Sequence, residues 1–168
     1  MALKKTIVTF CFNMLILTAF SQSQRYAEDS IIAQNLIENK LKSLQALGVV
    51  NYLYLFSDVG SIVIVYEING KICGVRSYYK GNRSSKFKSL KLSNEDKLNY
   101  GRCIDMASKD KIVGFSNCKD FVHSINRIVF TTRANGHYLQ GNFTSDCSGA
   151  LGENNMLCLF NIYKNLLL

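Results

Sequence analysis

The 168-residue sequence contains no proline and no tryptophan, and it has only two histidines. At an average usage of ~5 %, about eight prolines would be expected in a chain of this length. Their absence excludes collagen-like, mucin-like and proline-rich linker architectures. Beyond the N-terminal segment, no stretch approaches the run of about 18 uninterrupted apolar residues that a membrane-spanning helix needs. We therefore expect no membrane span in the rest of the chain.

The composition that is present is typical of a globular protein. Hydrophobic residues make up 48% of the chain and charged residues 19%, values that exclude wholesale disorder. A chain of 168 residues has room for one domain with a proper core, but not comfortably for two. We therefore expect residues 22–168 to form a single domain.

Residues 1–21 have the features of a cleaved secretory signal peptide. Two lysines give the segment a positively charged start, and residues 6–20 form a mostly apolar stretch. Ala19 and Ser21 have the small-residue spacing that signal peptidase recognises, so we expect cleavage after Ser21. The apolar stretch is shorter than the ~20 residues of a membrane anchor. These features predict an exported protein, periplasmic or extracellular, whose net charge falls from +8 to +6 when the two leader lysines are removed.

Hydrophobic periodicity predicts four helical segments. In residues 28–47, apolar side chains recur at steps of three and four, and a glycine follows the segment. Residues 93–107 begin with a serine followed three residues later by an aspartate, which is typical of a helix start. A shorter helix is expected at residues 117–124. The tail, residues 153–168, fits either a helical stripe or a buried strand, and its length favours a helix.

Two Asn-Gly dipeptides each predict a β-hairpin. Asn69-Gly70 lies between two runs of β-forming residues, and a two-residue type I′ turn at this point pairs Ile68 with Lys71. Asn135-Gly136 has similar flanks and predicts a second hairpin of the same kind. Residues 51–56, which are rich in aromatic strand formers, predict a strand before the first hairpin.

The register of the first hairpin divides its side chains between two faces. The more apolar face, which we expect to form the core, carries Ile62, Ile64, Tyr66, Ile68, Cys73 and Val75. The opposite face carries Val63, Val65, Glu67, Ile72 and Arg76. The order of the elements predicts an α+β domain with a mainly antiparallel sheet, built from the two Asn-Gly hairpins, with helices packed on one face.

The strongest non-random feature of the sequence is a cationic segment, residues 71–91. It contains no acidic residue and seven basic residues, namely Lys71, Arg76, Lys80, Arg83, Lys86, Lys88 and Lys91. Tyr78, Tyr79 and Phe87 are interleaved with these cations, in positions from which aromatic rings can stack on a ligand. The alternative is a solvated loop whose lysines keep the protein soluble and protect an edge strand.

A segment of this kind attracts anionic partners, with an affinity that falls as the salt concentration rises. The candidate binding residues are Arg76, Tyr78, Tyr79, Lys80, Arg83, Lys86, Lys88 and Lys91. For an exported protein, an anionic surface such as lipid head groups, an acidic glycan or an acidic protein is a better partner than nucleic acid, and no known nucleic-acid module is present. The leading hypothesis is a small, non-catalytic binding or inhibitor (immunity-type) module. An envelope protein without a ligand is an alternative.

Five cysteines remain once the leader is removed, so at least one is left over or pairs between chains. Export places these thiols in an oxidising compartment where disulfides persist. Cys73 falls on the predicted core face of the first hairpin, where a thiol acts as a small apolar residue. Short loops favour disulfides Cys103–Cys118 and Cys147–Cys158, although the sequence alone does not choose among the possible pairings.

Signatures of catalysis and of metal binding are scarce. The sequence has no CxxC pair, HExxH motif, phosphate-binding loop or dinucleotide fingerprint, so we expect no metal and no cofactor. A Cys118 nucleophile and a His123 base would lie about 140° apart on a helix and would not face each other. His137 follows an Asn-Gly turn and is most simply a surface residue. A small secreted hydrolase with a Cys/His centre assembled by the fold is the catalytic alternative.

Overall fold

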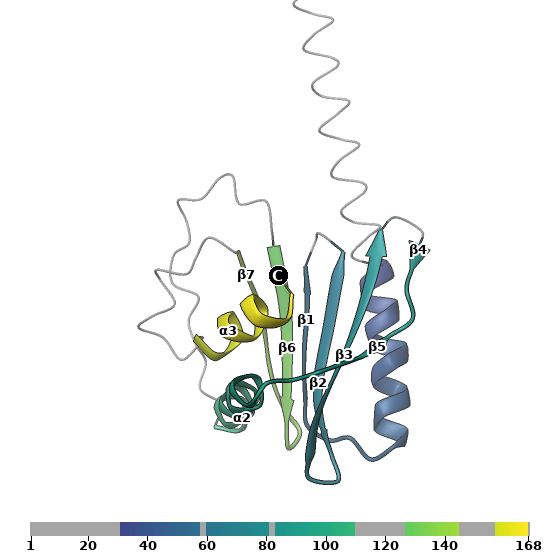
Figure 1. The fold of residues 1–168 in the computed structure, drawn as a ribbon. Helices are drawn as coiled ribbons and strands as arrows, with labels where there is room; N and C mark the ends of the chain where they lie inside the picture. Colours follow the sequence, from purple (N-terminus) through teal and green to yellow (C-terminus); the bar gives the residue numbers. More distant parts are fainter. Residues whose placement is uncertain (1–30, 58–59, 81–82, 110–126, 145–156, 168) are drawn as a thin grey trace, which may run out of the picture.

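The computed structural model describes residues 31–57, 60–80, 83–109, 127–144 and 157–167, which form one sheet and three helices (Figure 1). The first helix spans residues 31–46. The strands are β1 (Tyr52–Ser57), β2 (Ser61–Ile68), β3 (Lys71–Lys80), β4 (Arg83–Ser84), β5 (Lys88–Leu90), β6 (Arg127–Ala134) and β7 (His137–Thr144), and the other helices are α2 (Asn94–Ser108) and α3 (Leu157–Leu166).

Several predicted features fall outside these ranges. They are the signal peptide at residues 1–21, the short helix at residues 117–124, and the side chains of Cys118, His123 and Cys147. The helix predicted for the tail is confirmed as α3. Within the described ranges, no helix combines the length and the apolar character required to cross a bilayer.

The seven strands are hydrogen-bonded in the order β4-β3-β2-β1-β6-β7, and β5 pairs with β3 off this path. All strand pairings among the described residues are antiparallel. The structure therefore confirms an α+β fold with a mainly antiparallel sheet. β1 lies inside the sheet because it pairs with β2 along one edge and with β6, far away in the sequence, along the other.

Tight turns at the two Asn-Gly dipeptides join β2 to β3 and β6 to β7. In the first turn Ile68 lies opposite Lys71, and Asn69 and Gly70 have φ angles of 50° and 70°. In the second turn, Asn135 and Gly136 have φ angles of 49° and 91°. A type I′ turn requires positive φ at both central positions, and asparagine and glycine adopt it at the lowest cost.

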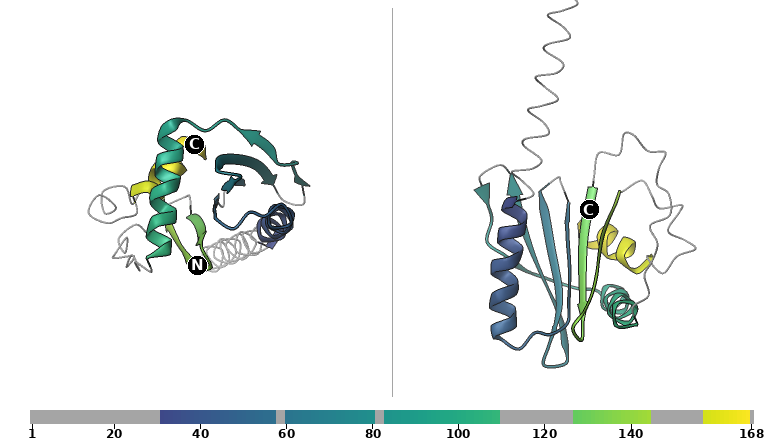
Figure 2. Two further views of the ribbon diagram at one scale, coloured as in Figure 1. Left: turned by 90° about the horizontal axis from the view of Figure 1, so that it is seen from below. Right: turned by 180° about the vertical axis from the view of Figure 1, so that it is seen from behind.

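Both faces of the sheet are buried, and different helices cover them. The first-helix core contains Ala33, Ile37, Leu41, Leu44, Val49, Tyr52, Phe56, Ile62, Ile64, Val75 and Tyr79. The α2–α3 core contains Leu53, Leu55, Val63, Val65, Tyr100, Cys103, Met106, Cys158, Leu159, Ile162 and Leu166. Figure 2 shows the first helix on one side of the sheet and α2 and α3 on the other.

The prediction that the helices pack on one face is therefore wrong, and β2 shows why. Its residues 61–65, SIVIV, are buried at every position. A near-continuous apolar run of this kind is typical of a strand that is covered on both sides. Ile62 and Ile64 are in the core as expected, on the side of the first helix, whereas Val63 belongs to a second core with α2 and α3. In this strand the continuous apolar run indicated burial on both faces, and it was a better guide than the small difference in apolar character between the two faces.

Helix α2 begins with a capping box that also reaches α3. The Asp96 backbone N–H donates to the Ser93 Oγ at 3.1 Å, and the Ser93 N–H donates to the Asp96 Oδ2 at 2.8 Å. Asn165 of α3 donates its side-chain amide to the Asp96 Oδ1 at 3.1 Å. Burial opposes ionisation of Asp96, but the hydrogen bonds from Ser93 and Asn165 outweigh it and lower the pKa of this carboxyl. Asp96 therefore joins the start of α2 to α3.

Replacing Asp96 with alanine is expected to lower the free energy of unfolding by about 2 kcal/mol, because the cap and the bond from Asn165 are lost together. The Asp96 pKa is lower in the folded protein, so the stability it contributes is complete above the unfolded-state pKa and is lost as the pH falls through the folded-state value. Urea titrations at neutral and acidic pH measure both effects.

Two variants give the controls for this measurement. Asp96→Asn keeps the shape of the side chain but cannot ionise, so its stability should change less on acidification than that of the wild type. Glu95→Gln alters an exposed carboxylate in the same helical turn, outside the capping box, and should lower stability much less than Asp96→Ala. Identical acid destabilisation of Asp96→Asn and wild type would contradict this account of Asp96.

Candidate functional site

Residues 83–91, which we call the basic strap, run antiparallel along the outer edge of β3. Ser84 lies opposite Tyr79 in the β3–β4 pair, and Lys88 lies opposite Arg76 in the β3–β5 pair. Between these pairs Ser85 anchors the strap. Its N–H donates to the Tyr78 carbonyl oxygen at 2.7 Å, and its Oγ accepts from the Tyr78 N–H at 2.8 Å. The strap is therefore held by backbone pairing at the edge of the sheet.

The cations of the basic strap project into solvent. Arg83, Lys86, Lys88 and Lys91 are all exposed. No carboxylate in the described part of the chain forms an ion pair with any of the four. Lys80 ends β3 directly before the strap, and only its backbone is described. These four charges are therefore available to a partner rather than neutralised by the described carboxylates.

Arg76 and Tyr78 extend the cationic surface along β3. The Arg76 Nη1 donates to the Tyr78 hydroxyl at 3.0 Å, and the guanidinium carbon lies 5.8 Å from the centre of the Tyr78 ring. The Tyr78 side chain is 53% exposed. Because residues directly opposite each other in a sheet share a face, Lys88 lies beside Arg76. Three of the predicted binding residues are thus brought together, on the face of the sheet that carries Val63 and the α2–α3 core.

Tyr79 is a core residue and not part of this surface. It is 4% exposed, belongs to the first-helix core, and donates its hydroxyl hydrogen to the Ser57 carbonyl oxygen at 2.6 Å. Successive side chains of a strand point to opposite faces, so an exposed Tyr78 leaves Tyr79 pointing inward. We therefore omit Tyr79 from the candidate binding surface.

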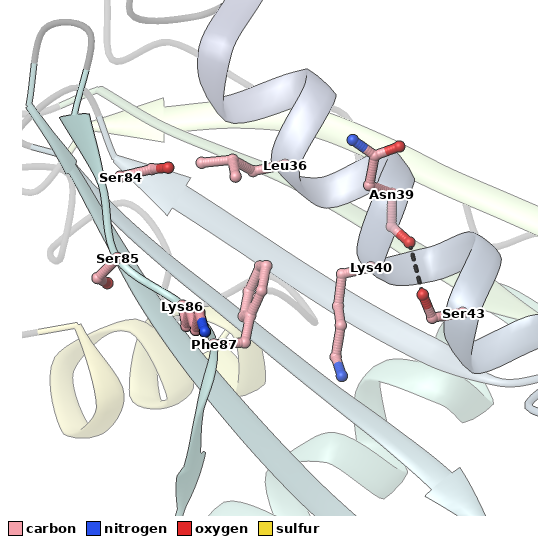
Figure 3. A pocket seen from close by; sticks show the side chains of 8 residues that line it. All are labelled: Leu36, Asn39, Lys40, Ser43, Ser84, Ser85, Lys86 and Phe87. Carbon is pink, nitrogen blue, oxygen red and sulfur yellow. Dashed lines mark hydrogen bonds between the residues drawn. The ribbon is translucent and has the colours of Figure 1, made fainter.

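A groove of about 420 Å³ separates the basic strap from the first helix (Figure 3). Its lining residues are Leu36, Asn39, Lys40 and Ser43 from the helix and Ser84, Ser85, Lys86 and Phe87 from the strap. Figure 3 shows the Phe87 ring between the two walls, beside Lys40. The Lys40 ammonium lies 5.9 Å from the centre of that ring. The groove therefore has an apolar part, made by Leu36 and Phe87, and two lysines.

Lys40 is the member of this site that the sequence did not reveal. It is separated from the strap by more than 40 residues of sequence and by three strands. Part of the groove can be recognised in the sequence once the fold is known. Leu36, Lys40 and Ser43 follow one another at steps of four and three, so they share one face of the helix. No pattern in the sequence indicated that this face would lie opposite the strap.

The groove offers binding groups rather than a catalytic pair. Its two ammonium groups and its serine hydroxyls can hold an anion, while Phe87 and Leu36 can contact the apolar part of the same ligand. None of its eight described lining residues is a histidine, cysteine or carboxylate.

The described cysteines and histidine are distributed away from the groove. Cys103 and Cys158 are buried against each other, with their sulfur atoms 2.7 Å apart. Cys73 is half-buried on β3, and His137 is exposed at the start of β7. Among the described residues, no three histidine, cysteine or acidic side chains are grouped so that they could hold a metal ion. The predicted pairings Cys103–Cys118 and Cys147–Cys158 each involve a residue outside the described ranges.

No protein-family model matches this chain, and neither the curated proteins nor the solved structures give a match. Its function must therefore be argued from the chemistry of the basic strap and the groove.

Proposed function

We propose that this protein is a small, exported, non-catalytic binding module of the inhibitor or immunity type, which holds a carboxylate-bearing partner in the groove and along the basic strap. The observation that carries the proposal is the row of exposed strap cations, which form no ion pair with a carboxylate among the described residues, on a strap that also forms one wall of a groove containing an aromatic ring. Export is proposed from the leader-like residues 1–21.

Charge complementarity explains why such a surface would act on an acidic partner. An acidic protein and a uronate-containing glycan both present carboxylates attached to less polar groups. Lys40 and Lys86 can contact the carboxylate while Phe87 contacts the attached carbon skeleton. Arg76, Lys88 and Tyr78 lie at the same edge of the sheet but on its other face, because Arg76 lies opposite Val63 of the α2–α3 core, and they give a longer partner that wraps around this edge further contacts. Such contacts favour fast association at low salt and lose strength as salt rises.

The hydrolase alternative has less support. Cys103 and Cys158 are buried in the α2–α3 core, and His137 begins β7 at a hairpin turn. The described lining of the groove contains neither a cysteine nor a histidine, so it does not supply the proposed Cys/His centre. An envelope protein without a ligand would be the conclusion if the wild-type protein bound none of the acidic probes below.

The test compares two triple variants with the same change in net charge. Lys40→Gln, Lys86→Gln and Lys88→Gln together are expected to weaken binding to a carboxylate polymer by at least about tenfold at low salt, since each lost contact contributes on the order of 0.5–1 kcal/mol. The control combines Lys42→Gln, Lys97→Gln and Lys164→Gln, which are exposed elsewhere. It should change the affinity by less than about threefold, because only long-range attraction is reduced.

Two polymers serve as probes in this comparison. Polygalacturonate represents the acidic glycan and polyglutamate the acidic protein, and their binding is measured by biolayer interferometry over a range of salt concentrations. A clear preference for one of them identifies the source of the carboxylate. Equal weakening by the two triple variants would show that binding follows net charge alone and would overturn the proposed site.

A further inference from the structure

Two cysteines from separate helices meet inside the α2–α3 core. Cys103 lies in the third turn of α2 and is 0% exposed, and Cys158 lies at the start of α3 and is 4% exposed. The Cys103 thiol donates a hydrogen bond to the Cys158 sulfur at 2.7 Å, across 55 residues of sequence. This contact brings two thiol groups together with no polar side chain between them.

The two helices hold this contact in place from both ends. Tyr100 and Met106, one turn on either side of Cys103, pack in the same core as Leu159 and Ile162. The hydrogen bond from Asn165 to Asp96 joins the other end of α3 to the start of α2. The relative position of the two sulfur atoms is therefore set by packing that does not depend on a covalent bond.

We propose that Cys103 and Cys158 form a disulfide that fixes α3 to α2. This pairing replaces both of those favoured by short loop length, since each of them used one of these two cysteines. The inference does not depend on the proposed function of the groove. It depends on export only for the oxidant, because disulfides form and persist outside the reducing cytosol.

The oxidation is a two-step exchange with a small-molecule disulfide such as oxidised glutathione. In one of the two orders of attack, the Cys158 thiolate attacks one sulfur of that oxidant, breaks its S–S bond and releases one thiol. The Cys103 thiolate then attacks the Cys158 sulfur of the mixed disulfide and releases the second thiol. The cysteine pair thus loses two protons and two electrons, and the oxidant becomes two thiols.

The contact between the two cysteines makes their thiols unequal. The hydrogen bond from Cys103 lowers the pKa of the Cys158 thiol, whereas burial and the same hydrogen bond raise the pKa of the Cys103 thiol. This difference holds while the two helices are docked. Because both sulfur atoms are then buried, the oxidant reaches them only before α3 has docked completely or when it opens, and either thiolate can make the first attack.

Peptide mapping of the wild-type chain tests the pairing directly. The full chain, produced with its own N-terminal segment, is denatured without reductant, alkylated, and digested with trypsin and a glutamate-specific protease. Cleavage after Arg102 and Lys109 isolates Cys103, and cleavage after Glu153 separates Cys158 from Cys147. We expect the peptide at residues 103–109 to be linked to the peptide at residues 154–164, and both to be released by reductant.

Two results of the mapping would overturn the proposal. One is Cys103 or Cys158 that is still alkylated, and therefore unlinked, after refolding in a glutathione redox buffer, and the other is Cys103 linked to Cys118. The digest is repeated on protein refolded in a glutathione redox buffer. If the two thiols are reduced in the cell but linked in this buffer, the result counts against export and in favour of the pairing. Failure of the export proposal is therefore distinguishable from failure of the disulfide proposal.

Thermal unfolding provides a second measurement. Closing a loop of this length should raise the Tm of the oxidised wild type over the reduced form by on the order of 10 °C. Cys103→Ala, Cys158→Ala and the double variant should each lack this reductant-dependent shift to the same extent. The matched control is Cys73→Ala, which removes a half-buried cysteine of β3 and should retain it. A full shift in the double variant would contradict the proposed pairing.

Discussion

Replacing Val63 with aspartate is expected to lower the free energy of unfolding by about 4–5 kcal/mol, enough to unfold a domain of ordinary stability. Val63 is 1% exposed and belongs to the α2–α3 core, where a carboxylate would be removed from water among apolar side chains. Urea denaturation followed by far-ultraviolet circular dichroism measures the change. A protein that is already unfolded without urea would also meet this expectation.

Two neighbours in β2 provide the controls. Ile62→Ala empties space in the first-helix core and should cost about 2–4 kcal/mol. Glu67→Gln alters an exposed side chain at the end of the same strand and should change stability by less than about 0.5 kcal/mol. If Val63→Asp were as stable as Glu67→Gln while Ile62→Ala was destabilised, only one face of the sheet would be buried, and the two-core description would be wrong.

Replacing Gly60 with alanine is expected to cost about 3 kcal/mol or more. Gly60 has a φ of +92°, and it is linked to β3 because its carbonyl oxygen accepts a hydrogen bond from the Tyr79 N–H at 2.8 Å. A methyl group at this position would overlap the Tyr79 carbonyl oxygen, which belongs to the backbone and cannot rotate away. The variant therefore combines an unfavourable φ with a steric clash. Thermal and urea unfolding give the measured difference.

Gly48→Ala is the matched control for the conformational part of this cost. Gly48 follows the first helix with a φ of +85°, and a methyl group there would meet no atom within 4 Å. It should cost only about 1 kcal/mol, the penalty of a left-handed alanine. The difference between the two variants then reports the overlap with Tyr79. Equal losses of stability would show that the loop relaxes and that the clash does not occur.

The parts of the fold that the sequence predicted well are those determined by local chemistry. Positive φ at Asn69 and Gly70 is required by the turn itself, so the dipeptide identifies the position of the turn without reference to the rest of the chain. The capping box of Ser93 and Asp96 similarly identifies the start of α2. Each of these two features is determined by interactions among four consecutive residues.

The candidate site was predicted less completely, because it depends on contacts between distant segments. Strands β4 and β5 are only 2 and 3 residues long and mostly polar, so neither hydrophobic periodicity nor length distinguishes them from a loop. The burial of Tyr79 was predictable, since it alternates with Tyr78 and shares the inward face with Val75. The contribution of Lys40 to the groove was not predictable, because it results from the packing of the first helix across the sheet.

The position of β1 has a consequence for the growing chain. Residues 52–80 contain a complete local meander, in which contacts form between segments that follow one another closely. The other edge of β1 pairs only with β6, which begins at Arg127, so this contact has a high contact order and closes late. Until then the backbone of YLYLFS has one unpaired edge, open to association with other nascent chains. A fragment that ends before residue 127 should therefore aggregate, whereas the complete chain shields that edge within its own sheet.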